Sequence, residues 1–67
     1  MIAITVNGED RRFDTPLVVS GLLDRLELAG RRVAVELNGE IVPKSQHATT
    51  VINDGDKLEI VVAVGGG

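Results

Sequence analysis

The sequence predicts a two-layer α+β domain in which one helix covers one face of a β-sheet. Three observations predict it: short segments with alternating apolar residues, a single segment with apolar residues at helical spacing, and two Asn-Gly pairs of the kind that connect hairpin strands. The chain has 67 residues, which is the length of one small domain. The predicted element order is strand, strand, helix, strand, strand, strand.

The first two strands are expected to form a hairpin. In residues 1–6, Ile2, Ile4 and Val6 lie on one face and Ala3 and Thr5 on the other, which is typical of a strand with one buried side. Asn7-Gly8 follows, and this pair is the strongest short signal for a hairpin turn. The second strand should cover residues 9–14, with Phe13 as its apolar residue.

The helix is expected to begin at Thr15 and to end at Gly30. Thr15 is a favourable N-cap residue, and Pro16 fits the first helical position. Gly30 suits the left-handed conformation that often follows the last helical residue. The apolar stripe of this helix consists of Val19, Leu22, Leu23 and Leu26. The core should join Leu22, Leu23 and Leu26 to Ile2, Ile4, Val35, Ile60 and Val62.

The third and fourth strands should form a second hairpin. Residues 33–37 alternate again between apolar and other side chains, and Asn38-Gly39 predicts the turn. Residues 40–42 form a short strand that ends at Pro43, because proline cannot donate to the ladder.

The last strand is expected over residues 57–63. Residues 44–51 show no clear period, which predicts a loop with space for one helical turn. Asp54 and Asp56 belong to a tight turn before the strand, since the further ligands of a calcium loop are absent.

Composition excludes several classes of function. The chain has no cysteine, which excludes disulfides, thiol chemistry and the usual zinc or iron–sulfur sites. The net charge of −3 argues against nucleic acid as a partner, and the pairs Arg11-Arg12 and Arg31-Arg32 are interpreted as solvated turn flanks. His47 is the single histidine and has no cluster of ligand residues, so it is predicted to be a surface or packing residue. We expect no metal site and no catalytic residue.

The sequence also predicts a soluble, cytoplasmic protein. The N-terminus has no basic region followed by a long apolar stretch, so no signal peptide is expected. The longest apolar run, residues 60–64, is far too short to span a bilayer, and no membrane contact is expected.

The C-terminal glycines suggest a carrier of an activated group. We expect residues 1–64 to form the domain and residues 65–67 a slim, flexible tail, because glycine has no side chain and the widest backbone freedom. The α-carboxylate of Gly67 is a poor electrophile until ATP converts it to an acyl-adenylate, from which a sulfur nucleophile can displace AMP. The alternative is a frayed or appended end without function.

The whole chain resembles the ThiS group of ubiquitin-like β-grasp sulfur carriers, which serve the synthesis of the thiazole of thiamine. The resemblance rests on three stretches of the sequence, with His47 near the place where the group has an aromatic residue. These stretches are Asn38-Gly39-Glu40-Ile41-Val42-Pro43-Lys44, the Asp54-Gly55-Asp56 turn with Leu58-Glu59-Ile60-Val61, and the terminal Val64-Gly65-Gly66-Gly67.

The resemblance implies a fold, a role and partners. The fold would be a β-grasp with the first and last strands side by side at the centre of the sheet. An E1-like adenylyltransferase would adenylate Gly67 with ATP and Mg²⁺, a sulfur-transfer enzyme would convert it to a thiocarboxylate, and thiazole synthase would take the sulfur. The carrier itself would bind no cofactor and would not be an enzyme. Gly65 and Gly66 would supply reach.

Three other roles stay open at this point. The small subunit of molybdopterin synthase shares the β-grasp and the Gly-Gly end. A protein modifier would form isopeptide bonds through Gly67. A plain β-grasp binding module would have an inert tail.

A partner surface is predicted on the sheet face away from the helix, close to the tail. The alternation of the last strand turns Glu59, Val61 and Ala63 outward, and Ala34 and Glu36 should face out in the same way. The predicted patch is weakly apolar with acidic flanks and consists of Ala34, Val61 and Ala63. The alternative is that these are scattered exposed apolar residues without function.

Overall fold

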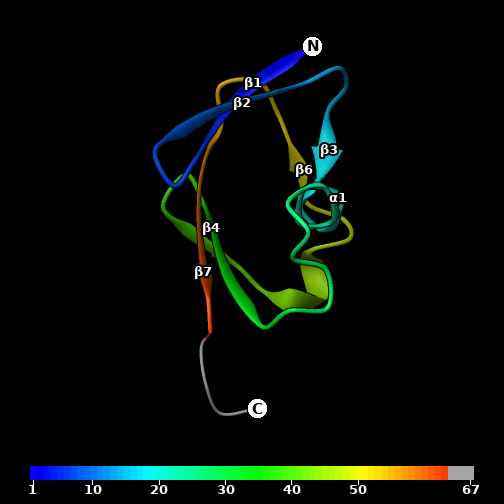
Figure 1. Ribbon diagram of the computed structural model, residues 1–67, viewed down its shortest axis with the longest axis vertical. Helices are drawn as coiled ribbons and strands as arrows, with labels where there is room; N and C mark the ends of the chain where they lie inside the picture. The colour runs from blue at the N-terminus through cyan, green and yellow to red at the C-terminus, as the bar shows by residue number, and fades with distance from the viewer. Residues whose placement is uncertain (64–67) are drawn as a thin grey trace.

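The computed structural model describes residues 1–63, in which a mixed β-sheet packs one of its faces against a helix (Figure 1). The strands of this sheet are β1 (Ile2–Val6), β2 (Glu9–Phe13), β4 (Val33–Leu37), β5 (Glu40–Val42) and β7 (Lys57–Val62). Their order across the sheet is β2-β1-β7-β4-β5. The predicted α+β class is confirmed, and the predicted bounds of these strands agree with the structure to within one residue.

The first and last strands lie side by side at the centre of the sheet. β1 and β7 run parallel, with Thr5 opposite Lys57 and Val6 opposite Leu58. The other pairs, β2 with β1, β4 with β7 and β5 with β4, are antiparallel. A parallel pair needs a long crossover connection, and the helix lies within it. This is the β-grasp arrangement that the resemblance implied.

The helix begins later than the sequence predicts. Helix α1 spans Val19–Arg25, and its N-cap is Val18 instead of Thr15. The residues before it form β3 (Leu17–Val18), which pairs with β6 (Val51–Ile52) in a second, two-stranded sheet. Because this pairing holds residues 17 and 18 extended, the prediction that the helix starts at Thr15 and Pro16 is wrong.

The helix also ends earlier than predicted. Its C-cap is Leu26, and Glu27 follows with a φ of 61°, in the left-handed region. Leu28 N–H donates to the carbonyl of Leu23 at 2.8 Å, and Glu27 N–H donates to Asp24 at 3.0 Å, which is the Schellman pattern. The prediction of Gly30 as the cap is wrong, because Glu27 closes the helix three residues earlier. Within residues 1–63, no helix has the length and apolar character needed to cross a membrane.

The segment between β5 and β7 is more ordered than the predicted loop. It contains a 3-10 helix, η1 (Lys44–Gln46), which agrees with the space expected for one helical turn. It also contains β6, which the sequence analysis missed because two residues are too few to show a period.

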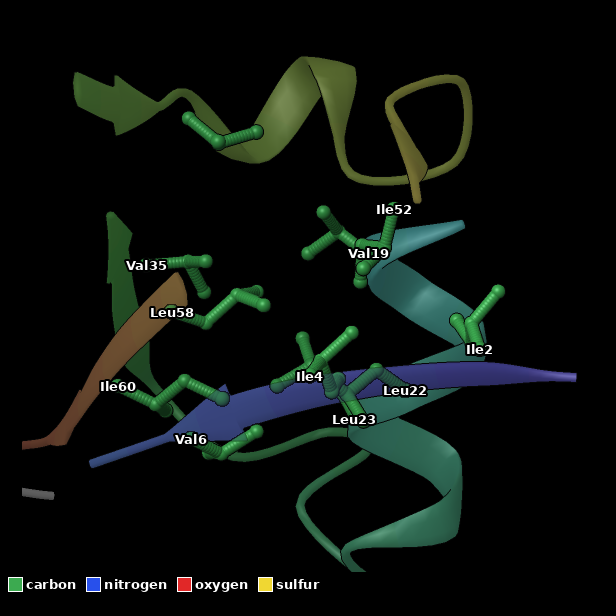
Figure 2. Packing of buried hydrophobic residues seen from close by; sticks show 11 residues of the cluster. Ile2, Ile4, Val6, Val19, Leu22, Leu23, Val35, Ile52, Leu58 and Ile60 are labelled. Atoms are coloured by element: carbon green, nitrogen blue, oxygen red, sulfur yellow. The ribbon is translucent and has the colours of Figure 1, made fainter. Parts of the chain in front are cut away.

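The core lies between α1 and the sheet face that it covers, here called the inner face (Figure 2). Side chains from β1, β4 and β7 point from the sheet toward Leu22 and Leu23. Leu26 is half-buried and packs against this core, whereas Val62 is half-buried and does not belong to it, which corrects the prediction that both are buried there. The described core consists of Ile2, Ile4, Val6, Val19, Leu22, Leu23, Val35, Val42, Ile52, Leu58 and Ile60.

Leu22→Ala should test how much this core contributes to the stability of the domain. Leu22 is fully buried, with 0% of its surface exposed, so truncation leaves a cavity and costs about 2–5 kcal/mol. A domain of this size typically holds only about 3–5 kcal/mol, so the variant should be largely unfolded at 25 °C in chemical denaturation followed by circular dichroism. Ile41→Ala is the matched control, since Ile41 is 64% exposed and its truncation should shift the midpoint little. Equal shifts of the denaturation midpoint for the two variants would contradict the assignment of Leu22 to the core.

Candidate functional site

The predicted functional residues lie at and beyond the end of β7. Gly67, the predicted thiocarboxylate residue, and the tail residues Gly65 and Gly66 lie outside the described residues. The described part of the site is therefore β7, Ala63 and the surfaces around them. β7 is paired on both sides, and its ladder with β4 runs from Leu58 opposite Leu37 to Val62 opposite Val33.

Asn7 holds the second half of β7. β1 ends at Val6, but the backbone N–H of Asn7 still donates to the carbonyl of Leu58 at 2.9 Å. The side-chain amide of Asn7 then pairs with both backbone groups of Ile60. Its Oδ1 accepts from the N–H at 2.7 Å, and its Nδ2 donates to the carbonyl at 3.0 Å. The amide thus extends the β1 ladder by one step along β7.

Asn38 holds the start of β7 from the other side. Its backbone N–H donates to the carbonyl of Lys57 at 2.7 Å, and its Oδ1 accepts from Lys57 N–H at 2.9 Å. Its Nδ2 donates to Asp56 Oδ1 at 3.0 Å. Asn7 and Asn38 have positive φ angles of 51° and 52°, as the turn prediction requires. Both hairpin turns therefore also clamp β7, which the sequence analysis missed.

The turn before β7 is held by its two aspartates. Asp54 Oδ1 accepts from the backbone N–H of Ala3 at 2.7 Å, and Asp56 Oδ2 accepts from Asn53 N–H at 2.7 Å. The interpretation of both residues as turn residues is confirmed. In the part of the chain that the structure describes, no group of three or more His, Cys, Asp or Glu residues could hold a metal ion.

His47 is a packing residue. It is 9% exposed, and its Nε2 donates to the carbonyl of Val42 at 3.0 Å, because a carbonyl oxygen can only accept. Its own carbonyl accepts from Ser20 N–H at 2.8 Å, and the carbonyl of Thr50 accepts from Val19 N–H at 3.0 Å. The loop around His47 therefore satisfies the first amides of α1, where no side chain caps the helix.

The predicted partner patch lies on the outer face of the sheet, the face away from α1. Ala34 and Val61 are directly opposite each other on β4 and β7, and Val61 is 65% exposed. Ala34 and Ala63 are exposed as well. The predicted exposure is confirmed, whereas the role of the patch in binding stays a prediction.

Next to this patch, the outer face carries an acidic pair and a further apolar residue. Glu36 lies directly opposite Glu59, and two like charges in such a position repel each other. Ile41 lies opposite Glu36 on β5 and is 64% exposed. The acidic flanks agree with the prediction. Ile41 was missed, although its place between buried Val42 and the Asn-Gly turn already turned it outward.

The end of β7 is fixed up to the last described residue. Ala63 N–H donates to the carbonyl of Arg32 at 2.9 Å, just before β4 begins. The last described residue, Ala63, is therefore held at one defined end of the domain.

Comparison with known proteins decides the family. The sequence matches the ThiS family over residues 2–67, which is nearly the whole chain. This chain belongs to the ThiS family. The resemblance predicted from the sequence is thus confirmed, and membership supports a role as a sulfur carrier.

A solved structure of the same family supports the assignment. The crystal structure of a thiamine biosynthesis protein (ThiS) from Geobacter metallireducens has a TM-score of 0.83 and 38% sequence identity to this ThiS-family chain. The alignment covers 98% of this chain and 100% of the other.

Curated relatives include much longer proteins. A thiazole synthase of Paramagnetospirillum magneticum is 53% identical over 64 residues, which are 96% of this chain and 20% of the relative. The ThiS-family chain thus spans about a fifth of the length of that relative. An uncharacterized protein, ycf40, of Pyropia yezoensis is 42% identical over 98% of this chain and 93% of its own length.

Asn7→Gly should release the middle of β7 in this ThiS-family domain. Glycine keeps the positive φ of the turn but removes both side-chain bonds to Ile60, which are partly buried. The loss of stability should be about 1–3 kcal/mol, and the amide of Ile60 should exchange with solvent much faster in an NMR hydrogen-exchange experiment.

Asn38→Gly is the matched comparison, because its side-chain bonds are exposed and their loss should cost less. Unchanged protection of the Ile60 amide in Asn7→Gly would show that the clamp does not hold the strand.

Proposed function

We propose that this chain is the sulfur carrier for the thiazole of thiamine, with the thiocarboxylate formed on Gly67. The observation that carries the proposal is the ThiS-family match, which extends from residue 2 to the terminal Gly67. The similarity to a thiamine biosynthesis protein and to thiazole synthases supports the thiamine pathway over the other roles considered.

The chemistry requires activation of a carboxylate. An E1-like adenylyltransferase, using ATP and Mg²⁺, joins the Gly67 carboxylate to AMP and releases pyrophosphate. A persulfide or sulfide sulfur from a sulfur-transfer enzyme then attacks the acyl carbon, and AMP leaves. Where a persulfide attacks, the product is an acyl disulfide, and a thiol then attacks the sulfur of the transfer enzyme, which releases the thiocarboxylate and leaves a disulfide on the enzyme. Thiazole synthase accepts this sulfur. Because the steps consume ATP, the proposal places the protein in the cytoplasm.

The structure supports this role through the way it presents the tail. β7 is the central strand, it is clamped at Lys57 and Ile60, and it is bonded to Arg32 at Ala63. A partner that binds the domain therefore holds the root of the tail at a defined place, which raises the effective concentration of Gly67 at the adenylating site. Tail glycines without side chains suit a narrow enzyme cleft.

The partner surface in this proposal is the outer-face patch of Ala34, Val61 and Ala63. It is exposed and lies on the two strands next to the tail. Thiazole synthase is supported as a partner because a protein of that name contains a stretch 53% identical to this chain.

Intact mass should test the carrier role. After coexpression with the adenylyltransferase and sulfur-transfer enzyme of the same organism, the protein should gain the mass of one sulfur in place of one oxygen. Deletion of Gly66-Gly67 should abolish the gain while the melting temperature stays nearly unchanged, since a glycine tail buries almost nothing. A ladder of conjugates would indicate a modifier, and an unmodified mass would indicate an inert module.

Val61→Lys should test the patch. A lysine in the centre of the patch should weaken binding to the adenylyltransferase by about tenfold or more, because it places an unpaired charge in a desolvated contact, while the protein stays folded. Isothermal titration calorimetry measures the dissociation constant. Val51→Lys is the control, since Val51 is 49% exposed on β6, outside the main sheet. If both variants bind the adenylyltransferase with the dissociation constant of the unmodified sequence, the patch is not part of the binding surface.

A further inference from the structure

A pocket of about 370 Å³ opens between the C-terminal end of α1, the loop before β4, and η1. Its walls combine two kinds of side chain. Apolar groups of Leu23, Leu28 and Val33 line it, and so do the cationic side chains of Arg31, Arg32 and Lys44. One carboxylate, that of Asp24, also lines it.

The charge of this pocket is opposite to that of the whole chain. The chain has a formal net charge of −3, yet three cations and one carboxylate meet here. Within residues 1–63, the single ion pair closer than 4 Å joins Arg11 to Glu9, so the three cations of the pocket have no carboxylate partner among the described residues. The excess of positive over negative charge in this pocket favours an anionic ligand.

The pocket lies at the root of the tail. Arg32, which lines it, accepts through its carbonyl from Ala63 N–H at 2.9 Å, and Val33 lies opposite Val62. Figure 1 shows the end of β7 and the loop before β4 at the same end of the domain. The pocket therefore lies next to the last described residue, Ala63.

Hydrogen bonds within the domain hold the segments that surround the pocket, so the site is preformed. The Schellman bond from Leu28 N–H to Leu23 and the bond from Arg31 N–H to Leu28 at 3.0 Å fix one side. His47, which also lines the pocket, is held by Val42 and Ser20 on the other side. A preformed site loses less conformational entropy on binding than one that must be ordered by its ligand.

We propose that this pocket receives an acidic segment of thiazole synthase, with a carboxylate bound by the cationic residues Arg31, Arg32 and Lys44 and an apolar side chain against the apolar lining residues. A free inorganic anion would use the cationic lining residues alone and leave the apolar lining residues in water, so a segment that carries both groups fits better. This inference rests on the proposed function, because thiazole synthase is the partner that the relatives' names support.

The pocket also complements the outer face. The outer face carries the repelling pair Glu36 and Glu59, whereas the pocket carries Arg31, Arg32 and Lys44. A partner that encloses the root of the tail has to present a positive group to one surface and a negative group to the other. Such opposed charges fix the orientation of docking and exclude the reversed one.

Reversal of an arginine pair tests the proposal. Arg31→Glu/Arg32→Glu should weaken binding of the full chain to purified thiazole synthase of the same organism by about tenfold or more, measured as a dissociation constant at low salt. Arg11→Glu/Arg12→Glu is the matched control, because it changes the same dipeptide and the same net charge on β2, at the far edge of the sheet. The control should change the constant by less than about threefold.

Each other result overturns the proposal. Equal weakening by both variants would mean that only net charge matters, and an unchanged constant would mean that the pocket is not used. Weakening of adenylyltransferase binding alone would assign the pocket to the other enzyme. If the reversed pair does not fold by NMR, Arg31→Gln/Arg32→Gln replaces it with the same criteria.

The mass test keeps the two proposals apart. If the unmodified sequence gains no sulfur, the carrier function fails. If it gains sulfur while the reversed pair binds thiazole synthase normally, only the pocket proposal fails.

Discussion

The pairing of β7 at the centre of the sheet is the constraint on which the other features depend. This strand contributes Leu58 and Ile60 to the core and leads directly to the tail. A slip by one residue would turn both side chains to the outer face, because successive side chains of a strand alternate. The backbone ladders to β1 and β4 resist such a slip, and Asn7 and Asn38 add side-chain bonds at two separate points of β7.

The same pairing determines where the rest of the chain can go. Since β1 and β7 are parallel, the intervening chain must cross over the sheet, and α1 with β3 and β6 covers the inner face in doing so. The helix has no side-chain cap, and its first amides donate to carbonyls of the His47–Thr50 loop. That loop is therefore tied to the helix, and together with the Schellman turn after α1 it forms the pocket beside the tail.

For a carrier, this construction separates a fixed body from the group that reacts. The body offers two surfaces: an outer face with exposed Val61 and the acidic pair Glu36 and Glu59, and a pocket with three cations next to the end of β7. Enzymes that act in turn on one carboxylate can recognise the same body and differ in which surface they use most. In the proposed function, recognition depends on the body, while the chemistry takes place on Gly67.

The sequence by itself determined the strands of the main sheet, the two hairpin turns and the glycine end, because these depend on local signals: alternation, Asn-Gly pairs and residue identity. The resemblance added the β-grasp order. Only the tertiary structure decided that residues 17–18 are extended, since their bonds come from β6, more than thirty residues away. It also decided that Lys44 meets Arg31 and Arg32 at one pocket, because the fold brings η1 next to the loop before β4. The end of the helix at Glu27 instead of Gly30 depends on local Schellman bonds, but the sequence does not signal it, because a glutamate rarely adopts a positive φ.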